Sequence, residues 1–253
     1  MTALFRPRWL AAIGALLALG GAALYMGSAH ANPKPRAESL VLPSGEQPST
    51  MESFLTSVTK DVDTYWTKQF KDSGLDEPRV SYQWIPDGQS ASSACGGAGA
   101  DAAAYCRADD TIYISESFAT NIFDGSLDQQ LPGSSQGFGG TYGDFAVAYI
   151  VAHEYGHEVQ DELGLYDKYG DQLPTMAFEL QADCYAGNWA NSANQEGRLE
   201  DGDVQEALSA ALAVGDFDDA NPEHHGTPEQ REAAWNAGFE SGDPQSCNQF
   251  LTT

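Results

Sequence analysis

The chain has 253 residues, which is enough for one domain with a hydrophobic core once an N-terminal targeting segment is set aside. Its 12 Lys and Arg stand against 37 Asp and Glu, a formal net charge of −25. This balance repels nucleic acids and anionic lipid surfaces, so we expect no nucleic-acid partner and interpret the charge as a solvated acidic surface.

The first 31 residues have the pattern of an export signal. Arg6 and Arg8 form a basic start, residues 9 to 26 are mainly apolar, and residues 29 to 31 are Ala-His-Ala, a small-residue cleavage pattern. The apolar stretch is also just long enough to span a bilayer if it stays uncut. We therefore expect a cleaved signal peptide or a single N-terminal membrane anchor. Either one places the remainder outside the cytoplasm, secreted or in the cell envelope.

Four cysteines in such an oxidising compartment predict two disulfides rather than metal ligands or nucleophiles. Cys95 and Cys106 close a short loop rich in Gly and Ala, which makes them the natural pair. Cys184 is then left to pair with Cys247.

The domain is expected to begin after a linker. Residues 32 to 48 contain four prolines and are predicted to be disordered, which leaves residues 49 to 253 for the domain. Ser49 and Glu52 have the spacing of a capping box, and apolar residues at near-helical spacing extend the predicted helix to about residue 71.

The remaining elements are a few strands followed by helices. Residues 80 to 85 and 111 to 115 alternate β-branched or aromatic residues with polar ones and predict short strands. Residues 124 to 140, rich in Gly, Ser and Gln, predict a connector. Further helices are predicted from a Thr141 cap to about 163, from 175 to 191, from 203 to 214, and from a Thr227 cap to 239. The chain is therefore assigned to the α+β class, mainly helical with a small sheet.

The predicted helix after Thr141 contains the pattern His-Glu-x-x-His. His153 and His157 are four residues apart, so both imidazoles leave the same face of the helix and can converge on one ion. Glu154 is rotated about 100° from His153, where a carboxylate can take a proton from a metal-activated water without binding the metal. Chance produces this pattern in roughly one chain of this length in two hundred. We expect a Zn²⁺ site, with ordinary hydrogen-bonded histidines as the alternative.

A catalytic zinc needs a third protein ligand. Glu179 and Asp183 lie four residues apart on the next predicted helix, 22 residues beyond the second histidine, enough for an antiparallel return. We expect Glu179 to be the third ligand and Asp183 to orient a ligand histidine from behind. The alternative is that Asp183 is the ligand. Taken alone, this segment could also be an acidic, solvent-exposed helix face with no metal.

Several segments together resemble the putative neutral zinc metallopeptidase family of bacteria. They are HEYGHEVQ from residue 153, ELQADCYAG from 179, HGTPEQR from 225, CRADDTIYIS from 106, and the CNQF that ends at 250. The resemblance implies a zincin-like, gluzincin-like fold with zinc at His153, His157 and Glu179 and with Glu154 as the catalytic residue. The chain departs from the pattern at Glu158, where the family is expected to have a second histidine.

A later histidine is a candidate for a second catalytic role. His225 precedes the Thr227 cap, and its resemblance to the late histidine of gluzincins suggests that it stabilises the oxyanion. A solvent-exposed loop histidine is the alternative.

Two other segments have weaker signals. The acidic stretch from 216 to 221 lacks the pattern of a calcium loop and is interpreted as solvated. The strand around Tyr113 is a candidate for binding an extended substrate, with ordinary core packing as the alternative.

The sequence thus predicts a zinc-dependent peptidase that hydrolyses peptide or protein substrates by a metal-activated water with Glu154 as general base. The alternative is a non-catalytic, zinc-binding cell-envelope module that holds a partner peptide. A cysteine hydrolase is disfavoured because all four cysteines pair plausibly. No pattern indicates an oligomeric state.

Overall fold

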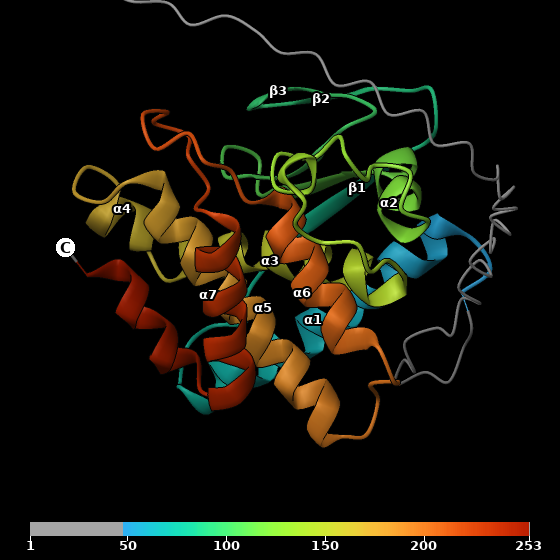
Figure 1. Cartoon of the computed structure of the whole chain (residues 1–253). Helices are drawn as coiled ribbons and strands as arrows, with labels where there is room; N and C mark the ends of the chain where they lie inside the picture. The colour runs from blue at the N-terminus through green and yellow to red at the C-terminus, as the bar shows by residue number, and fades with distance from the viewer. Residues whose placement is uncertain (1–47, 253) are drawn as a thin grey trace, which may run out of the picture. The chain divides into compact units, whose positions relative to one another are not determined.

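The computed structural model describes residues 48–252 (Figure 1). The predicted export signal or anchor at residues 1–31 lies outside the described residues, as does the predicted linker up to residue 47. Within the described part of the chain, no helix is both long and apolar enough to cross a membrane.

Helices make up most of this part of the chain. They are α1 Met51–Asp72, α2 Glu116–Phe123, α3 Asp144–Glu162, α4 Leu165–Tyr169, α5 Thr175–Gln195, α6 Asp203–Val214 and α7 Pro228–Ser241, with the 3₁₀ helices η1 Ser134–Gln136 and η2 Pro244–Leu251. The strands are β1 Ser81–Ile85, β2 Ala91–Ser93, β3 Gly96–Ala98, β4 Ala103–Cys106 and β5 Thr111–Ser115. This mainly helical composition with a small sheet confirms the predicted α+β class.

Helix α3 lies at the centre of the core. Every residue from Asp144 to Gln160 is buried, because α3 packs against α1, α5, α6 and strand β4 (Figure 1). A helix covered on all sides needs small and apolar residues around its whole circumference, and residues 145 to 152 provide them. The His-Glu-x-x-His pattern that follows in the same helix is therefore buried in the interior.

Glycines hold α5 and α7 unusually close together. A Cβ on Gly238 would lie 1.9 Å from the carbonyl oxygen of Cys184, and one on Gly187 would lie 2.1 Å from that of Trp235. Only the absence of a side chain at these positions lets the two helix backbones approach this closely. The Cys184–Cys247 disulfide fastens the same region. This packing places the first turns of α7 beside the polar residues of α5.

The three-stranded sheet has the order β1-β5-β4, with β5 parallel to β1 and antiparallel to β4. Strand β4 is thus an edge strand. Ala102 accepts a hydrogen bond from the Ser115 amide, and in an antiparallel ladder this directs the backbone groups of Ala104 toward β5 and those of Ala103 and Tyr105 away from it. The outward edge of β4 faces α3.

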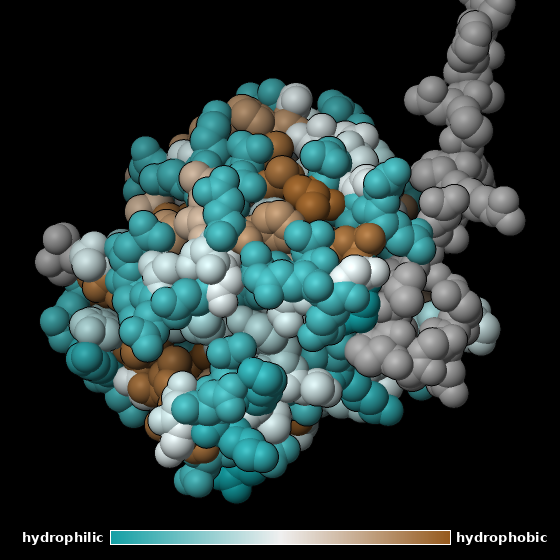
Figure 2. Space-filling view, turned by 90° about the horizontal axis from the view of Figure 1, so that it is seen from below, coloured by the Kyte–Doolittle hydropathy of each residue, from teal (hydrophilic) through white to brown (hydrophobic). Residues whose placement is uncertain are grey.

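The second disulfide, Cys95–Cys106, ties the β2–β3 hairpin to the end of β4. Both pairings expected from the sequence are present, and the described residues include no free cysteine. Figure 2 shows one face of the domain, where hydrophilic residues predominate over small apolar patches, as the acidic composition leads one to expect.

Two helix starts differ from the prediction. Helix α1 is capped one residue later than expected, by Thr50 with Ser53, because these two side chains make the reciprocal bonds of the capping box. Helix α3 begins at Asp144 without a Thr141 cap, and the Phe145 amide donates instead to Glu206 Oε2 from α6. The Thr227 cap of α7 is confirmed.

Candidate metal centre and active site

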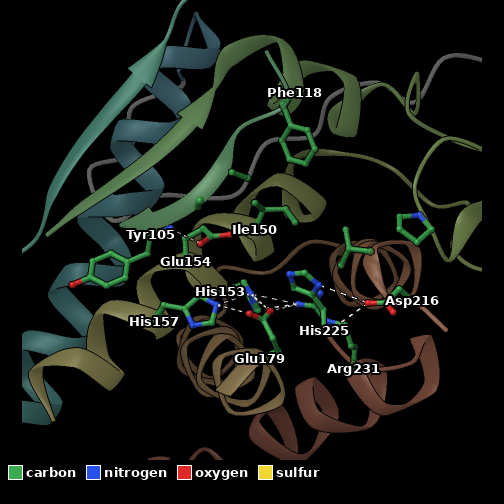
Figure 3. A pocket seen from close by; sticks show the side chains of 14 residues that line it. Tyr105, Phe118, Ile150, His153, Glu154, His157, Glu179, Asp216, His225 and Arg231 are labelled. Carbon is green, nitrogen blue, oxygen red and sulfur yellow. Dashed lines mark hydrogen bonds and ion pairs between the residues drawn. The ribbon is translucent and has the colours of Figure 1, made fainter. Parts of the chain in front are cut away.

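His153, His157 and Glu179 converge on one point between α3 and α5 (Figure 3). The two Nε2 atoms lie 3.2 Å apart, and Glu179 places one oxygen 3.2 Å from His153 Nε2 and the other 3.4 Å from His157 Nε2. The three side chains are buried. Burial raises the pKa of Glu179, but the two adjacent imidazoles outweigh it and hold that pKa well below its usual range.

Asp183 lies behind His153, away from this convergence point. Its Oδ1 is 2.8 Å from His153 Nδ1 and accepts a hydrogen bond from the Tyr149 hydroxyl, and its carboxylate is bound at both oxygens by Arg231, at 2.8 and 2.9 Å. Because a carboxylate only accepts, His153 Nδ1 donates, which leaves the Nε2 lone pair directed at the convergence point. The geometry favours Glu179 over Asp183 as the third ligand.

The opposite charges buried around Asp183 stabilise one another's ionised forms. Burial raises the pKa of Asp183, but the charges of Arg231 and His153 lower it below its ordinary value. Burial lowers the pKa of His153, yet the neighbouring Asp183 carboxylate more than offsets this and the pKa is raised to about 10. Sequence reasoning missed Arg231, whose one signal was its place in the HGTPEQR segment.

Gln160 is the hydrogen-bond partner of His157 Nδ1, as Asp183 is of His153 Nδ1. The amide nitrogen of Gln160 donates to the Phe178 carbonyl, so its oxygen is the atom turned toward His157 Nδ1, 3.0 Å away. Tyr166 donates to the same oxygen. His157 Nδ1 therefore donates as well, and its Nε2 is presented to the convergence point. Gln160 was also missed, although it stands three residues after His157 on the same helix.

Glu154 lies on the sheet side of the same cavity. Its Oε2 accepts a hydrogen bond of 2.8 Å from the backbone amide of Tyr105, one of the outward-facing residues of β4. The side chain is 7% exposed and lines the cavity together with His153, His157 and Glu179. The helix rotation expected from the sequence thus places this carboxylate beside the convergence point and outside the ligand group.

His225 lies on the opposite side of the cavity, between α6 and α7 (Figure 3). Its backbone amide donates to Asp216 Oδ2, and its Nδ1 is 3.7 Å from the same oxygen. The neighbouring His224 is buried and pairs with the other oxygen of Asp216. Burial opposes ionisation of Asp216, but the hydrogen bonds from the His225 amide and from His224 hold its pKa below its ordinary value. The interpretation of residues 216 to 221 as merely solvated is therefore wrong for Asp216.

Tyr113 and Glu158 both lie outside the cavity wall. Tyr113 lies on β5, which is hydrogen-bonded on both sides, so this strand has no free edge for a substrate, and the sheet edge beside the cavity belongs to β4. Glu158 is fully buried and does not line the cavity. Burial, with repulsion from Glu162 and Asp110, raises the pKa of Glu158 to about 9.

Comparison with known proteins identifies the class. The family described as "Putative neutral zinc metallopeptidase" matches residues 9–250, and the chain belongs to it. The resemblance drawn from the separate motifs is thereby confirmed.

Similar proteins occur in distant bacteria. The chain is 35% identical over 233 residues to "Uncharacterized protein YpfJ" of Escherichia coli K12, covering 83% of this chain and 74% of the relative. It is 38% identical over 170 residues to "Uncharacterized protein Rv2575" of Mycobacterium tuberculosis, covering 58% of this chain and 54% of the relative. No solved structure matches.

Proposed function

We propose that His153, His157 and Glu179 bind one zinc ion and that the chain is a zinc-dependent peptidase. Two imidazole nitrogens and one carboxylate, held by hydrogen bonds from behind, are a donor set that suits a catalytic zinc. Zinc bound there would polarise a carbonyl and lower the pKa of a water molecule. Membership of a zinc metallopeptidase family implies the same metal and a peptide or protein substrate.

Glu154 is proposed as the general base and later the proton donor to the leaving amine. The amide of Tyr105 donates to Oε2, which fixes the orientation of the carboxylate. Oε1 has no hydrogen bond among residues 48–252 and remains available for a proton from water. The observation that carries this assignment is the position of Glu154, in the cavity wall beside the three proposed ligands yet not among them.

The free edge of β4 supports a peptide as the bound chain. Ala103 directs its amide and carbonyl away from β5, and Tyr105 directs its carbonyl there, while the Tyr105 amide is taken by Glu154; both residues line the cavity. An extended peptide can add to such an edge through main-chain hydrogen bonds, and this would carry its carbonyl past Glu154.

His225 is proposed to donate a hydrogen bond to the oxyanion as the carbonyl becomes tetrahedral. It lines the cavity across from Glu154, and Asp216 fixes the backbone from which its side chain extends. Because the His225 side chain is about half exposed, it can turn toward a bound substrate without breaking a buried contact. Asp183 is a positioning residue that acts through His153.

We also propose that the domain works outside the cytoplasm, after export by the N-terminal segment. Two disulfides support this location, since such bonds persist in oxidising compartments. N-terminal sequencing of the protein purified from the cell envelope or medium tests it. A mature end near residue 32 agrees with cleavage, an intact Met1 in the membrane fraction agrees with an anchor, and recovery in the cytoplasm contradicts both.

The decisive experiment compares Glu154→Gln with Glu162→Gln, the same chemical change at an exposed position on the same helix. Each purified protein is analysed for zinc by inductively coupled plasma spectrometry and for cleavage of casein and of a quenched peptide library. We expect about one zinc per chain in all three proteins. We expect activity in wild type and Glu162→Gln that is abolished by a chelator, with a loss of about 10²-fold or more in Glu154→Gln.

Two outcomes contradict the proposal. Unreduced turnover in zinc-loaded Glu154→Gln removes Glu154 as the base. A zinc-loaded wild type that binds peptides but cleaves none indicates a non-catalytic binding module instead.

A further inference from the structure

The cavity continues on both sides of the proposed metal centre. One part, about 350 Å³, extends from the histidines past Ile150 to Phe118 and Val214. A second part, about 300 Å³, lies on the other side and reaches Leu173 and Phe178. The two parts share Tyr105, His157 and Glu179. A substrate chain that crosses the centre therefore has space for side chains on both sides of the reacting bond.

The walls of both parts are mainly apolar beyond the centre. The first is bounded by Phe118 from α2, Ile150 from α3 and Val214 at the end of α6. The second is bounded by the stacked rings of Tyr166 and Phe178, with Leu173 beside them. Transfer of apolar side chains from water to such walls is favourable, whereas a charged side chain there would lose its hydration.

Beyond the centre, the described residues that line the two parts offer no free charge that could hold the end of a peptide. Arg231 is the cavity's one guanidinium among the described lining residues, and it is 3% exposed and bound at two nitrogens by Asp183. Asp216 is the carboxylate farthest along the first part, and its oxygens already accept from His224 and the His225 amide. Apart from Glu154 and Glu179 at the centre itself, a terminal carboxylate or ammonium brought to either wall would meet no free opposite charge among the described lining residues.

From this arrangement we infer that the protein is an endopeptidase that cleaves internal bonds between apolar residues, with one apolar subsite on each side of the metal centre. This inference rests on the proposed function. An exopeptidase must close its cleft at one end and bind the terminal charge there, and the described residues do neither.

The test uses the zinc-loaded full chain and a set of eight-residue quenched peptides with a central Leu-Leu or Phe-Leu pair. Each peptide is made with free ends and with acetyl and amide caps. We expect the capped and free forms to have similar kcat/KM, and we expect mass spectrometry to find the cut inside the sequence. We expect Gly or Asp at either flanking position to lower kcat/KM by about 10- to 200-fold, the range for one lost apolar contact.

Two charge-introducing variants assign the subsites. Val214→Lys and Thr175→Lys each place an ammonium group in one part of the cavity, at half-buried positions. We expect each variant to accept Asp or Glu in place of Leu at one flanking position, and we expect the two variants to affect opposite sides of the cut. A general structural defect would lower all rates together and would not produce opposite switches of preference.

Several results overturn the inference. One is stepwise release of terminal residues. Another is a fall in kcat/KM of about 10⁴-fold on capping the peptide, as expected if a group that binds the terminal charge loses its partner. The third is a change of preference at the same flanking position in both lysine variants. Binding to zinc-loaded Glu154→Gln, followed by fluorescence anisotropy, separates this failure from that of the proposed function. Capped apolar peptides that bind but are never cut by wild type refute peptidase activity and leave the two-sided apolar cleft standing. Absence of both binding and cleavage refutes both proposals.

Discussion

Replacing Asp183 by Asn separates two roles of this side chain, the neutralisation of Arg231 and the orientation of His153. The guanidinium is bonded to both carboxylate oxygens at 2.8 and 2.9 Å and is 3% exposed. Opposite charges with centres about 4 Å apart attract by about 4 kcal/mol at an effective dielectric constant of about 20. Removing one partner of a buried pair costs about 3–5 kcal/mol, because the remaining charge stays buried.

The assay is urea unfolding of chelator-treated Asp183→Asn, Arg231→Met and the double variant. We expect Asp183→Asn to lose about 3–5 kcal/mol and the double variant to lose less than the sum of the single changes, by about 2 kcal/mol or more. Additive losses would refute the pairing as an energetic unit.

Zinc affinity, measured by competition with a chelating dye, reports the second role of Asp183. We expect Asp183→Asn to bind zinc about 10- to 100-fold more weakly, because a neutral amide replaces the carboxylate that orients His153 and raises its basicity. Adding Arg231→Met should restore part of the stability but none of this affinity. Wild-type zinc affinity in Asp183→Asn would contradict the assignment of Asp183 as a positioning residue.

Three further changes test other parts of the structure. Gln160→Met should weaken zinc binding about 10- to 100-fold in the same dye competition, because His157 Nδ1 loses the amide oxygen and keeps only the Tyr166 hydroxyl at 3.0 Å. An unchanged affinity would argue against a role for the Gln160 bond. Gly238→Ala should destabilise by about 1–3 kcal/mol or more in thermal unfolding, because its Cβ would meet an α5 carbonyl at 1.9 Å. Gly97→Ala, with nothing within 4 Å, is the control that should unfold like wild type. Burial raises the pKa of Asp203 from 3.8 to about 6. Between about pH 4 and 6 the folded protein therefore keeps a proton on Asp203 that the unfolded chain has released. The free energy of unfolding falls over this range as pH rises, by at most about 3 kcal/mol. Asp203→Asn should not show this fall in the free energy of unfolding, measured by urea titration with EDTA present. If wild type and Asp203→Asn lost stability with pH in parallel, the assignment to Asp203 would be contradicted.

The long helices were predictable because their signals are local. Helix α7 begins with Thr227, Pro228 and Gln230, whose cap and ring geometry need no distant partner. By contrast, the Ala103–Cys106 strand contains no β-branched residue and owes its conformation to pairing with β5. Short helices such as Leu165–Tyr169 were missed because they are stabilised by tertiary contacts rather than by propensity.

The candidate site divides in the same way. His153, Glu154 and His157 share one helix, so their relative directions follow from the helix period. The place of Glu179 followed from an assumed antiparallel return of α5, and the structure contains it, since Tyr149 bonds Asp183 while the later Gln160 bonds the earlier Phe178. Arg231 could not be placed from sequence, because its contact with Asp183 depends on how closely the glycines let α7 approach α5.

The charges buried at this site suit a divalent ion. Glu154, Glu179 and Asp183 are less than a tenth exposed, and the one cation buried with them, among the described residues, is Arg231. When the imidazoles are neutral, as metal ligation requires, these three carboxylates and one guanidinium leave two negative charges in the interior. Uncompensated buried charges cost several kcal/mol each. Without a metal the neighbouring carboxylates, against the opposing effect of burial, hold protons on the imidazoles instead, and the pKa of His153 is raised to about 10. A divalent cation at the convergence point balances both charges, and it does so where Asp183 and Gln160 already direct the two Nε2 lone pairs.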